Sequence, residues 1–138
     1  MPLTSKEIEA ANRAEATAIL IRRGYRVYRP EADVAGEDLV IRTPDGELLP
    51  VQMKGRPTVD WSRYGDHKIW MLFPDPAGDI PGRPWFFIKH DELFAWMKER
   101  HGTAPCWNDA WSDPYVSVDL ARFLQPFVLR PVATQAPK

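Results

Sequence analysis

The chain has 138 residues, 44% of them apolar, and carries a formal net charge of −1 at pH 7. This length and composition predict a single domain over residues 1–130 with a substantial hydrophobic core, followed by a disordered tail over residues 131–138. The near-neutral charge excludes a uniformly basic nucleic-acid binder, so any contact with nucleic acid requires basic residues that gather locally.

The cysteine count and the hydropathy pattern limit the compartment. Cys106 is the one cysteine, which excludes an internal disulfide framework and favours a reducing environment. The sequence has no N-terminal apolar segment typical of a secretion signal, and no run of about 18 apolar residues that predicts a membrane span. We therefore expect a cytoplasmic protein without a membrane partner.

The first predicted element is a helix that begins at Thr4 or Ser5 and ends at Arg23. Ser5 is the candidate N-cap, and Gly24 follows the last turn as a stop signal. Helical spacing predicts an apolar stripe that comprises Ile8, Ala11, Ala14, Ala18, Ile19 and Ile21.

Glu15 falls inside this apolar stripe. A carboxylate on the buried side of a helix is unfavourable unless it meets a partner or a cation. One interpretation is a salt bridge with Arg22, which lies two turns further along the same helix. The other is that Glu15 points toward the sheet and reaches polar groups on the strands that follow.

Three short strands are predicted after the helix. Residues 24–29 alternate between polar and apolar side chains, and Pro30 ends the run. The apolar runs 39–41 and 48–51 predict a β-hairpin, because Pro44-Asp45-Gly46 between them is a turn sequence.

The remainder of the chain alternates irregular segments with short elements. Residues 56–82 are rich in Gly, Pro and Asp, and only 69–73 predict a strand within them. A strand over 85–88, a helix over 91–100 and a short helix over 117–124 follow. The residues expected to face inward on the helix over 91–100 are Leu93, Phe94 and Met97.

The predicted hairpin gathers polar groups at one end. Asp38 opens its first strand, and the second strand ends in Gln52-Met53-Lys54. Because side chains alternate along a strand, Gln52 and Lys54 share one face while Val51 and Met53 take the other. An acid beside such a pair is suited to hold a divalent cation next to a phosphate. The pattern therefore predicts a nuclease.

The order Glu15, Asp38, Gln52-x-Lys54 on a helix and three strands resembles the PD-(D/E)XK nuclease superfamily. The similarity is greatest to its small members of the Holliday-junction resolvase and very short restriction endonuclease types. It covers about the first 56 residues, together with the predicted later strand and helix, 85–100. Gly24-Tyr25-x-Val27 and Asp33-x-x-Gly36-x-Asp38 support it.

The resemblance implies an α/β (α+β) fold with a restriction-endonuclease-like αβββαβ core, in which helices flank a mixed sheet. It also implies a Mg²⁺ or Mn²⁺ site on the hairpin and DNA as the partner. Asp38 corresponds to the family's metal-binding aspartate, and Glu15 to a helix glutamate that some members use as a further ligand. Lys54 corresponds to the lysine that orients or deprotonates the attacking water, or stabilises the charge on the phosphorane.

The sequence departs from the family pattern at Gln52, where most members carry Asp or Glu. An amide oxygen can ligate Mg²⁺, a hard cation that prefers oxygen donors, but one negative charge is lost. The backbone carbonyl of Met53 is a possible third ligand. Glu37 stands before Asp38, where the family's name-giving motif has proline.

Two groups of basic residues are candidates for contact with the nucleic-acid backbone. Arg22 and Arg26 belong to a cluster with Arg23 and Arg29, but arginines at a helix end also stabilise the helix terminus. The second group follows Lys54 and comprises Arg56, Arg63 and Lys68. We expect a DNA face along the segment after Lys54 and the C-terminal end of the first helix.

Several other residues have both ordinary and functional interpretations. Asp33 and Glu37 are loop charges or additional ligands, and His67 is a loop histidine or a phosphate contact. His90 and His101 lack the spacing of a zinc site. Trp70, Trp85 and Trp96 are expected in the core, whereas the following tryptophans cover a sheet edge or stack on bases: Trp61, Trp107 and Trp111.

The sequence thus leaves two functions open, besides a third interpretation in which the pattern is a coincidence and the chain is a plain α/β interaction domain. The first is a metal-dependent endonuclease that hydrolyses DNA at Asp38, Gln52 and Lys54 with support from Glu15, and that pairs as a homodimer to cut two strands. The alternative is a catalytically inactive module of the same fold that binds nucleic acid or a protein. The amide at position 52 and the mildly acidic pI favour the alternative.

Overall fold

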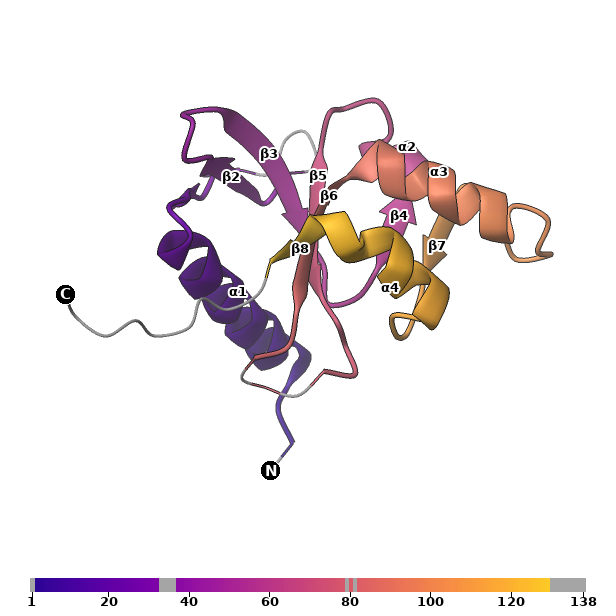
Figure 1. The fold of residues 1–138 in the computed structure, drawn as a ribbon, viewed down its shortest axis with the longest axis horizontal. Helices are drawn as coiled ribbons and strands as arrows, with labels where there is room; N and C mark the ends of the chain where they lie inside the picture. Colours follow the sequence, from indigo (N-terminus) through magenta and orange to yellow (C-terminus); the bar gives the residue numbers. More distant parts are fainter. Residues whose placement is uncertain (1, 33–36, 79, 81, 130–138) are drawn as a thin grey trace.

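The computed structural model describes residues 2–32, 37–78, 80 and 82–129, and it has a mixed α/β fold (Figure 1). Within these residues a six-stranded sheet has the order β1-β2-β3-β5-β6-β8, and a two-stranded sheet pairs β4 with β7. The strands of the large sheet are β1 (Arg26–Tyr28), β2 (Leu39–Arg42), β3 (Leu48–Met53), β5 (Trp70–Pro74), β6 (Trp85–Lys89) and β8 (Val128–Leu129). The remaining elements are α1 (Ser5–Arg22), β4 (Thr58–Asp60), α2 (Trp61–Tyr64), α3 (His90–His101), β7 (Ala110–Ser112), α4 (Val118–Leu124) and the 3₁₀ helix η1 (Gln125–Phe127).

The N-cap of helix α1 lies one residue earlier than expected. Thr4 is the N-cap: its side chain accepts a hydrogen bond from the Glu7 N–H, and the Glu7 side chain accepts one from the Thr4 N–H. Ser5, the predicted N-cap, is instead the first helical residue. Gly24 follows the helix at a φ of 89°, which is the backbone conformation that favours glycine.

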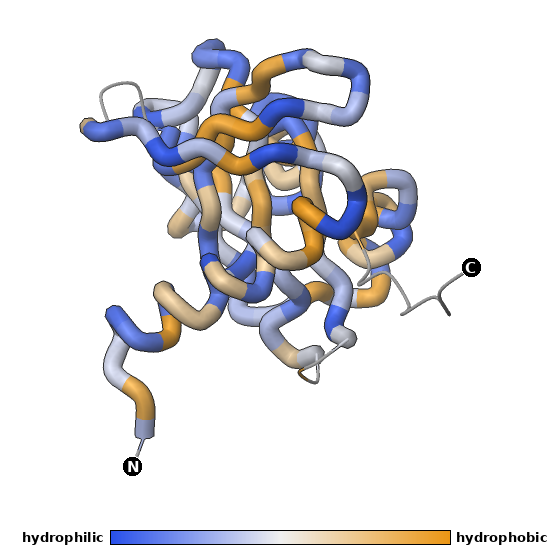
Figure 2. Tube along the Cα trace, turned by 90° about the vertical axis from the view of Figure 1, so that its left-hand side faces the viewer, coloured by the Kyte–Doolittle hydropathy of each residue, from blue (hydrophilic) through white to orange (hydrophobic). Residues whose placement is uncertain are grey.

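The predicted apolar stripe of α1 is largely wrong. Ile8 and Ile21 are 47% and 57% exposed, and the buried residues are Ala16, Ile19 and Leu20. The N-terminal end of the chain projects from the body of the molecule (Figure 2). Apolar residues lie on several sides of α1, so hydropathy alone did not identify the face that packs.

The predicted hairpin is confirmed. Strands β2 and β3 pair antiparallel, with Leu39 opposite Val51 and Ile41 opposite Leu49. Gly46 in the turn has a φ of 91°, and its N–H donates to the Thr43 carbonyl at 2.8 Å. Side chains alternate along β3 as expected, because Leu49, Val51 and Met53 are buried while the residues between them are half-buried.

The segment between β3 and β5 contains structure that the sequence did not predict. Strands β3 and β5 are parallel, with Gln52 opposite Met71, so the chain must cross over between them. Strand β4 and helix α2 lie in this crossover, and β4 pairs antiparallel with β7. These elements are short, and the partner of β4 lies about 50 residues further along the chain, which is why local sequence did not reveal the pairing.

Two hydrophobic clusters lie on opposite faces of the large sheet. The first joins α1 to alternate residues of the strands, such as Val51, Leu72 and Trp85. The second lies beneath α3 and α4 and includes the intervening strand residues, such as Met71 and Phe86. Figure 2 shows hydrophobic segments through the middle of the molecule and mostly hydrophilic outer loops. The predicted inward residues of α3 are all buried: Leu93, Phe94 and Met97.

The tryptophans divide differently from the expectation. Trp85 is fully buried, whereas Trp70 and Trp96 are partly buried and pack against the two clusters. Trp107 and Trp111 also pack against the second cluster, and Trp61 is 41% exposed.

Two further expectations concern residues that the structure does not describe and the absence of a membrane span. Asp33, Gly36 and the predicted tail 131–138 lie outside the described residues. Among the described helices, none has the length and apolar character needed to cross a membrane.

Candidate functional site

Asp38 is fixed at the point where β2 begins. Its backbone N–H donates to the Val51 carbonyl at 2.9 Å, which extends the hairpin ladder by one step. Its carboxylate oxygen Oδ1 accepts a hydrogen bond from the Met53 N–H at 3.1 Å. The aspartate therefore reaches the C-terminal end of β3.

Gln52 and Lys54 lie at this same end of β3. Gln52 is half-buried, and its side-chain oxygen Oε1 is fully buried without a hydrogen-bond partner among the described residues. The Lys54 backbone N–H donates to the Leu72 carbonyl at 2.9 Å, which holds the residue against β5. Its ammonium group lies 5.6 Å from the centroid of the Tyr64 ring.

These side chains line one cavity of about 330 Å³, which we call the hairpin cavity. Asp38, Gln52, Met53, Lys54 and Gly55 form one wall. The first half of α1 forms the other wall with Ser5, Ile8, Glu9 and Asn12. The structure thus brings together the four hairpin residues that the sequence placed in one site.

Glu15 does not line this cavity. Arg83 donates to both of its carboxylate oxygens, from Nε to Oε2 at 2.8 Å and from Nη2 to Oε1 at 3.0 Å. The Trp85 indole also donates to Oε2, at 2.5 Å. The helix carboxylate therefore has a structural partner on the start of β6, which is neither of the two partners expected from the sequence, Arg22 or the hairpin group.

The environment of Glu15 keeps its carboxylate ionised. Partial burial acts to raise the pKa of Glu15, but the hydrogen bonds from Arg83 and Trp85 and the charge of Arg83 outweigh it and hold the pKa below its ordinary value. Arg83 also donates to the Asn12 side chain at 2.8 Å. Because Asn12 lines the hairpin cavity, this network positions one wall of the candidate site.

Glu9, which was not predicted as a site residue, is the α1 carboxylate that lines the cavity. Its side chain is 63% exposed and forms an ion pair with Arg13 at 3.1 Å. The sequence contains a pattern that indicates this position. Ala16 and Ile19 are on the buried face of α1, and Glu9 and Asn12 extend that face toward the N-terminus at helical spacing.

The hairpin residues fit a hard divalent cation by the chemistry of their donors. Asp38 supplies a carboxylate, and the buried oxygen of Gln52 is an acceptor that nothing else in the described structure satisfies. The Met53 carbonyl is the third predicted oxygen donor. Within the described ranges, no group of three or more His, Cys, Asp or Glu side chains is arranged to hold a metal ion, so carboxylates alone do not form such a site.

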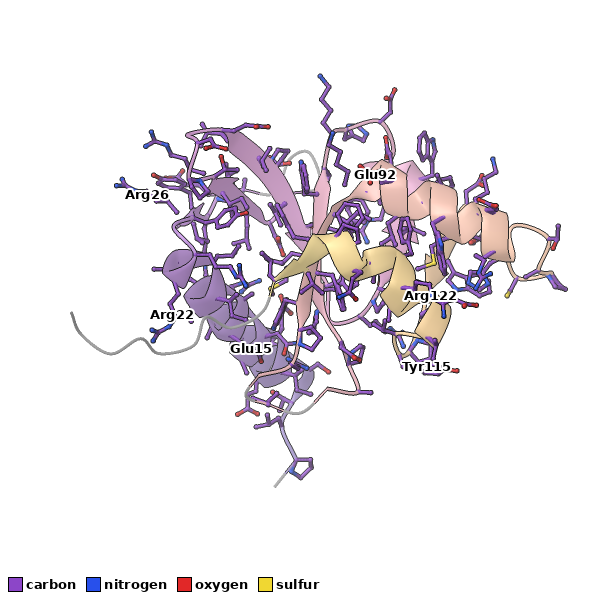
Figure 3. The ribbon with its side chains drawn as sticks, viewed as in Figure 1. Glu15, Arg22, Arg26, Glu92, Tyr115 and Arg122 are labelled. Atoms are coloured by element: carbon purple, nitrogen blue, oxygen red, sulfur yellow. The ribbon has the colours of Figure 1, made fainter. Side chains whose placement is uncertain are left out.

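The predicted DNA-contacting residues do not line one cavity. Arg63 lies near Lys54, and both line a second cavity beside the hairpin cavity. Arg56 is exposed in the loop that follows Lys54. Arg22 is ten residues beyond Asn12, or about 15 Å along α1, and Figure 3 shows it with Arg26 around the C-terminal end of that helix.

Lys68 is also distant from the hairpin cavity. It lines a separate pocket with Glu47 and Leu48, which lie at the beginning of β3 rather than at its end. Arg22, Arg26 and Lys68 are therefore not lining residues of the hairpin cavity.

The histidines are not gathered into a site. His90 is fully buried, its Nε2 accepts from the Asp60 N–H at 3.0 Å, and its Nδ1 lies 2.9 Å from Asp91 Oδ1. Burial lowers the pKa of His90 below its ordinary value, although Asp91 and Asp60 partly oppose this shift. His101 stacks on Trp111 with ring centroids 4.2 Å apart.

Comparison of the chain with protein-family models, with curated proteins and with solved structures finds no match.

Proposed function

We propose that this protein is a metal-dependent endonuclease of the PD-(D/E)XK type that hydrolyses DNA at the hairpin cavity. One observation carries the proposal. Asp38, Gln52 and Lys54 line a single cavity, and the Gln52 side-chain oxygen is buried without a partner among the described residues. A buried acceptor without a donor is costly, and a bound cation removes that cost.

The order of elements supports the restriction-endonuclease-like part of the proposal. Helix α1 precedes the antiparallel strands β1, β2 and β3, and the chain then passes through α2 to β5, which is parallel to β3. This sequence of elements agrees with an αβββαβ core. Strand β4 is an addition to that core, and it lies beside the candidate site.

Each hairpin residue has a role that follows from its position. Asp38 and Gln52, with the Met53 carbonyl, would hold Mg²⁺ through oxygen atoms. The bound ion would neutralise charge on the non-bridging oxygens of the scissile phosphate. Lys54 donates to the attacking water or to the phosphate oxygens, where its charge stabilises the negative charge that develops as the bond breaks.

A cleavage assay with a matched variant tests the proposal. Wild-type protein is incubated with Mg²⁺ or Mn²⁺ and plasmid, linear, single-stranded or branched DNA, in parallel with Asp38→Asn. We expect wild-type cleavage of at least one substrate and its loss in Asp38→Asn, because the amide removes the one carboxylate that the hairpin contributes. Equal cleavage by both proteins would refute the assigned site.

A second candidate function is an inactive module of this fold that binds nucleic acid or a protein. The observation that favours it is the amide of Gln52, which leaves Asp38 as the one hairpin carboxylate of the cavity. Fewer negative charges weaken the hold on a divalent cation. Absence of cleavage on every substrate, together with retained DNA binding, would support this function over the first.

A further inference from the structure

A second cavity of about 290 Å³ adjoins the candidate site and shares Lys54 with it. The crossover between β3 and β5 forms most of this cavity, and residues of β7 line the remainder. Its lining includes Lys54, Thr58, Asp60, Arg63, Tyr64 and Ser112. We call it the crossover cavity.

Two cations lie beside one aromatic ring in the crossover cavity. The Lys54 ammonium is 5.6 Å from the centroid of the Tyr64 ring, and the Arg63 guanidinium is 5.5 Å from it. Neither cation takes part in any of the ion pairs of the described residues. The one carboxylate of the cavity, Asp60, accepts a hydrogen bond from the Ser62 hydroxyl at 2.8 Å. The side chains that line the cavity therefore carry a positive net charge.

Uncharged hydrogen-bonding groups accompany the two cations. The Tyr64 hydroxyl is buried and has no hydrogen-bond partner among the described residues, although such a group normally finds one. The Thr58 hydroxyl donates to the Arg56 carbonyl at 3.0 Å and lies 3.0 Å from the Ser112 hydroxyl, which joins β4 to β7 across the cavity. These two hydroxyls therefore have no hydrogen left for a ligand, and the donors of the lining are Lys54, Arg63 and the Tyr64 hydroxyl. A tetrahedral oxyanion accepts hydrogen bonds from such donors, so their chemistry matches a phosphoryl group.

We propose that the crossover cavity binds a second phosphate of the substrate, next to the phosphate that is cut in the hairpin cavity. This inference rests on the proposed function for the identity of the substrate. Lys54 lies between the two cavities and contributes to both, while Arg63 serves the second phosphate alone. The phosphodiester group held there fixes the register of the backbone and so positions the neighbouring bond.

The test measures DNA binding without cleavage. Binding of a short fluorescein-labelled DNA duplex is followed by fluorescence anisotropy at several salt concentrations, in Ca²⁺ buffer and in the Asp38→Asn background. We expect Arg63→Ala to weaken binding roughly tenfold and to reduce the salt slope by about one unit. Arg122→Ala on α4, an arginine with 78% side-chain exposure (Figure 3), is the matched control and should bind like its parent.

Tyr64→Phe is a second variant that separates a loss of DNA binding from a loss of folding. This substitution keeps the aromatic ring beside the cations and removes a hydroxyl that has no partner in the described part of the chain, so stability should hold or rise while DNA binding weakens about threefold. Duplexes with one neutral methylphosphonate at successive positions locate the contact. At one position the methylphosphonate should weaken DNA binding by the parent protein and leave DNA binding by Arg63→Ala unchanged.

The outcomes separate this inference from the proposed function. Cleavage by wild type together with parental affinity and salt slope in Arg63→Ala would overturn the second phosphate site and leave the nuclease intact. Absence of cleavage together with Arg63-dependent binding would reject the nuclease and retain the phosphate site. Inorganic phosphate, titrated against the protein by NMR, should shift Tyr64 signals in the parent and not in Arg63→Ala.

Discussion

At the scale of single residues, Gln52 is the position that most constrains the chemistry of the hairpin cavity. Its side-chain oxygen is buried without a donor among the residues that the structure describes, and it lies beside an aspartate whose carboxylate is oriented by the Met53 N–H. An unpaired buried acceptor lowers stability, and a ligand that satisfies it removes this cost. Whether residue 52 is an amide or a carboxylate then sets how strongly a cation is bound.

Gln52→Glu should tighten the binding of Mg²⁺ roughly tenfold, because it adds a second carboxylate to Asp38. Without a divalent cation the two acids repel, so the melting temperature should fall below that of wild type. Saturating Mg²⁺ should then raise the melting temperature of the variant by more than it raises that of wild type, as differential scanning fluorimetry can show. An equal response to Mg²⁺ in both proteins would contradict a cation site at Gln52.

Lys54→Ala should reduce DNA cleavage by at least about 100-fold, because the lysine donates to the attacking water or to the phosphate oxygens. Mg²⁺ binding should remain nearly intact, since an ammonium group is not a metal ligand. Initial rates of plasmid cleavage and calorimetric Mg²⁺ titration give the two readouts. Lys98→Ala, at an exposed position of α3, is the control, and an active Lys54→Ala protein excludes the assigned role.

At the scale of elements, α1 has two functions along its length. Its second half packs through Ala16, Ile19 and Leu20, whereas its first half contributes Glu9 and Asn12 to the hairpin cavity. The first half has few apolar contacts with the sheet, so its capping box contributes a large share of what keeps it helical.

Thr4→Ala should destabilise the protein by about 1 kcal/mol, because it removes the hydroxyl that accepts from the Glu7 N–H. Ser5→Ala should change the free energy of unfolding by less than about 0.5 kcal/mol, since Ser5 is already inside the helix. Urea unfolding followed by circular dichroism compares the two variants. The reverse order of effects would restore Ser5 as the N-cap.

At the scale of the whole molecule, polar groups join layers that lie far apart in the sequence. Glu15 on α1 is bound by Arg83 and Trp85 at β6, and the buried ring of His90 on α3 accepts from the Asp60 N–H of β4. Each contact fixes a helix relative to strands on one face of the sheet. Both involve a group whose pKa differs from its ordinary value, so each makes stability depend on pH.

The Glu15 contact should stabilise the protein above about pH 4.5 and lose its effect in more acidic solution. The folded-state pKa is lowered, so the unfolded chain binds the proton more readily and stability falls as pH drops through the folded pKa. Glu15→Gln should therefore be less stable than wild type at pH 7, and the difference should shrink at acidic pH. Urea unfolding across this range is the measurement, and Glu99→Gln on the exposed side of α3 is the control.

His90 should make the protein less stable as pH falls below about 6.5. Its folded-state pKa is lowered, so the unfolded chain binds more protons in this range and stability rises with pH. His90→Gln should lose this dependence even if its overall stability is lower. The exposed His67 is the matched control, and His67→Gln should retain the slope in unfolding experiments between pH 5.5 and pH 7.5.

Local pattern was sufficient for much of the fold. The ranges of α1, the β2–β3 hairpin, β5, β6, α3 and α4 agree closely with the predicted elements, because each has a period, a turn or a stop signal in its own sequence. Strands β4, β7 and β8 were not predicted. They have two or three residues each, too few for a detectable period, and they form only because a distant strand pairs with them.

The sequence alone determined the hairpin end of the candidate site. Turn chemistry and alternation place Asp38 against the end of β3 and put Gln52 and Lys54 on one face, and both effects act within a few residues. Only the tertiary structure decided which part of α1 meets that hairpin. Arg83, 68 residues beyond Glu15 and just before β6, binds the Glu15 carboxylate, and Glu9 and Asn12 are the α1 side chains that lie at the cavity with Ser5 and Ile8. Because α1 has apolar residues on several sides, its own sequence does not specify which face points inward. Contacts with distant residues such as Arg83 decide it.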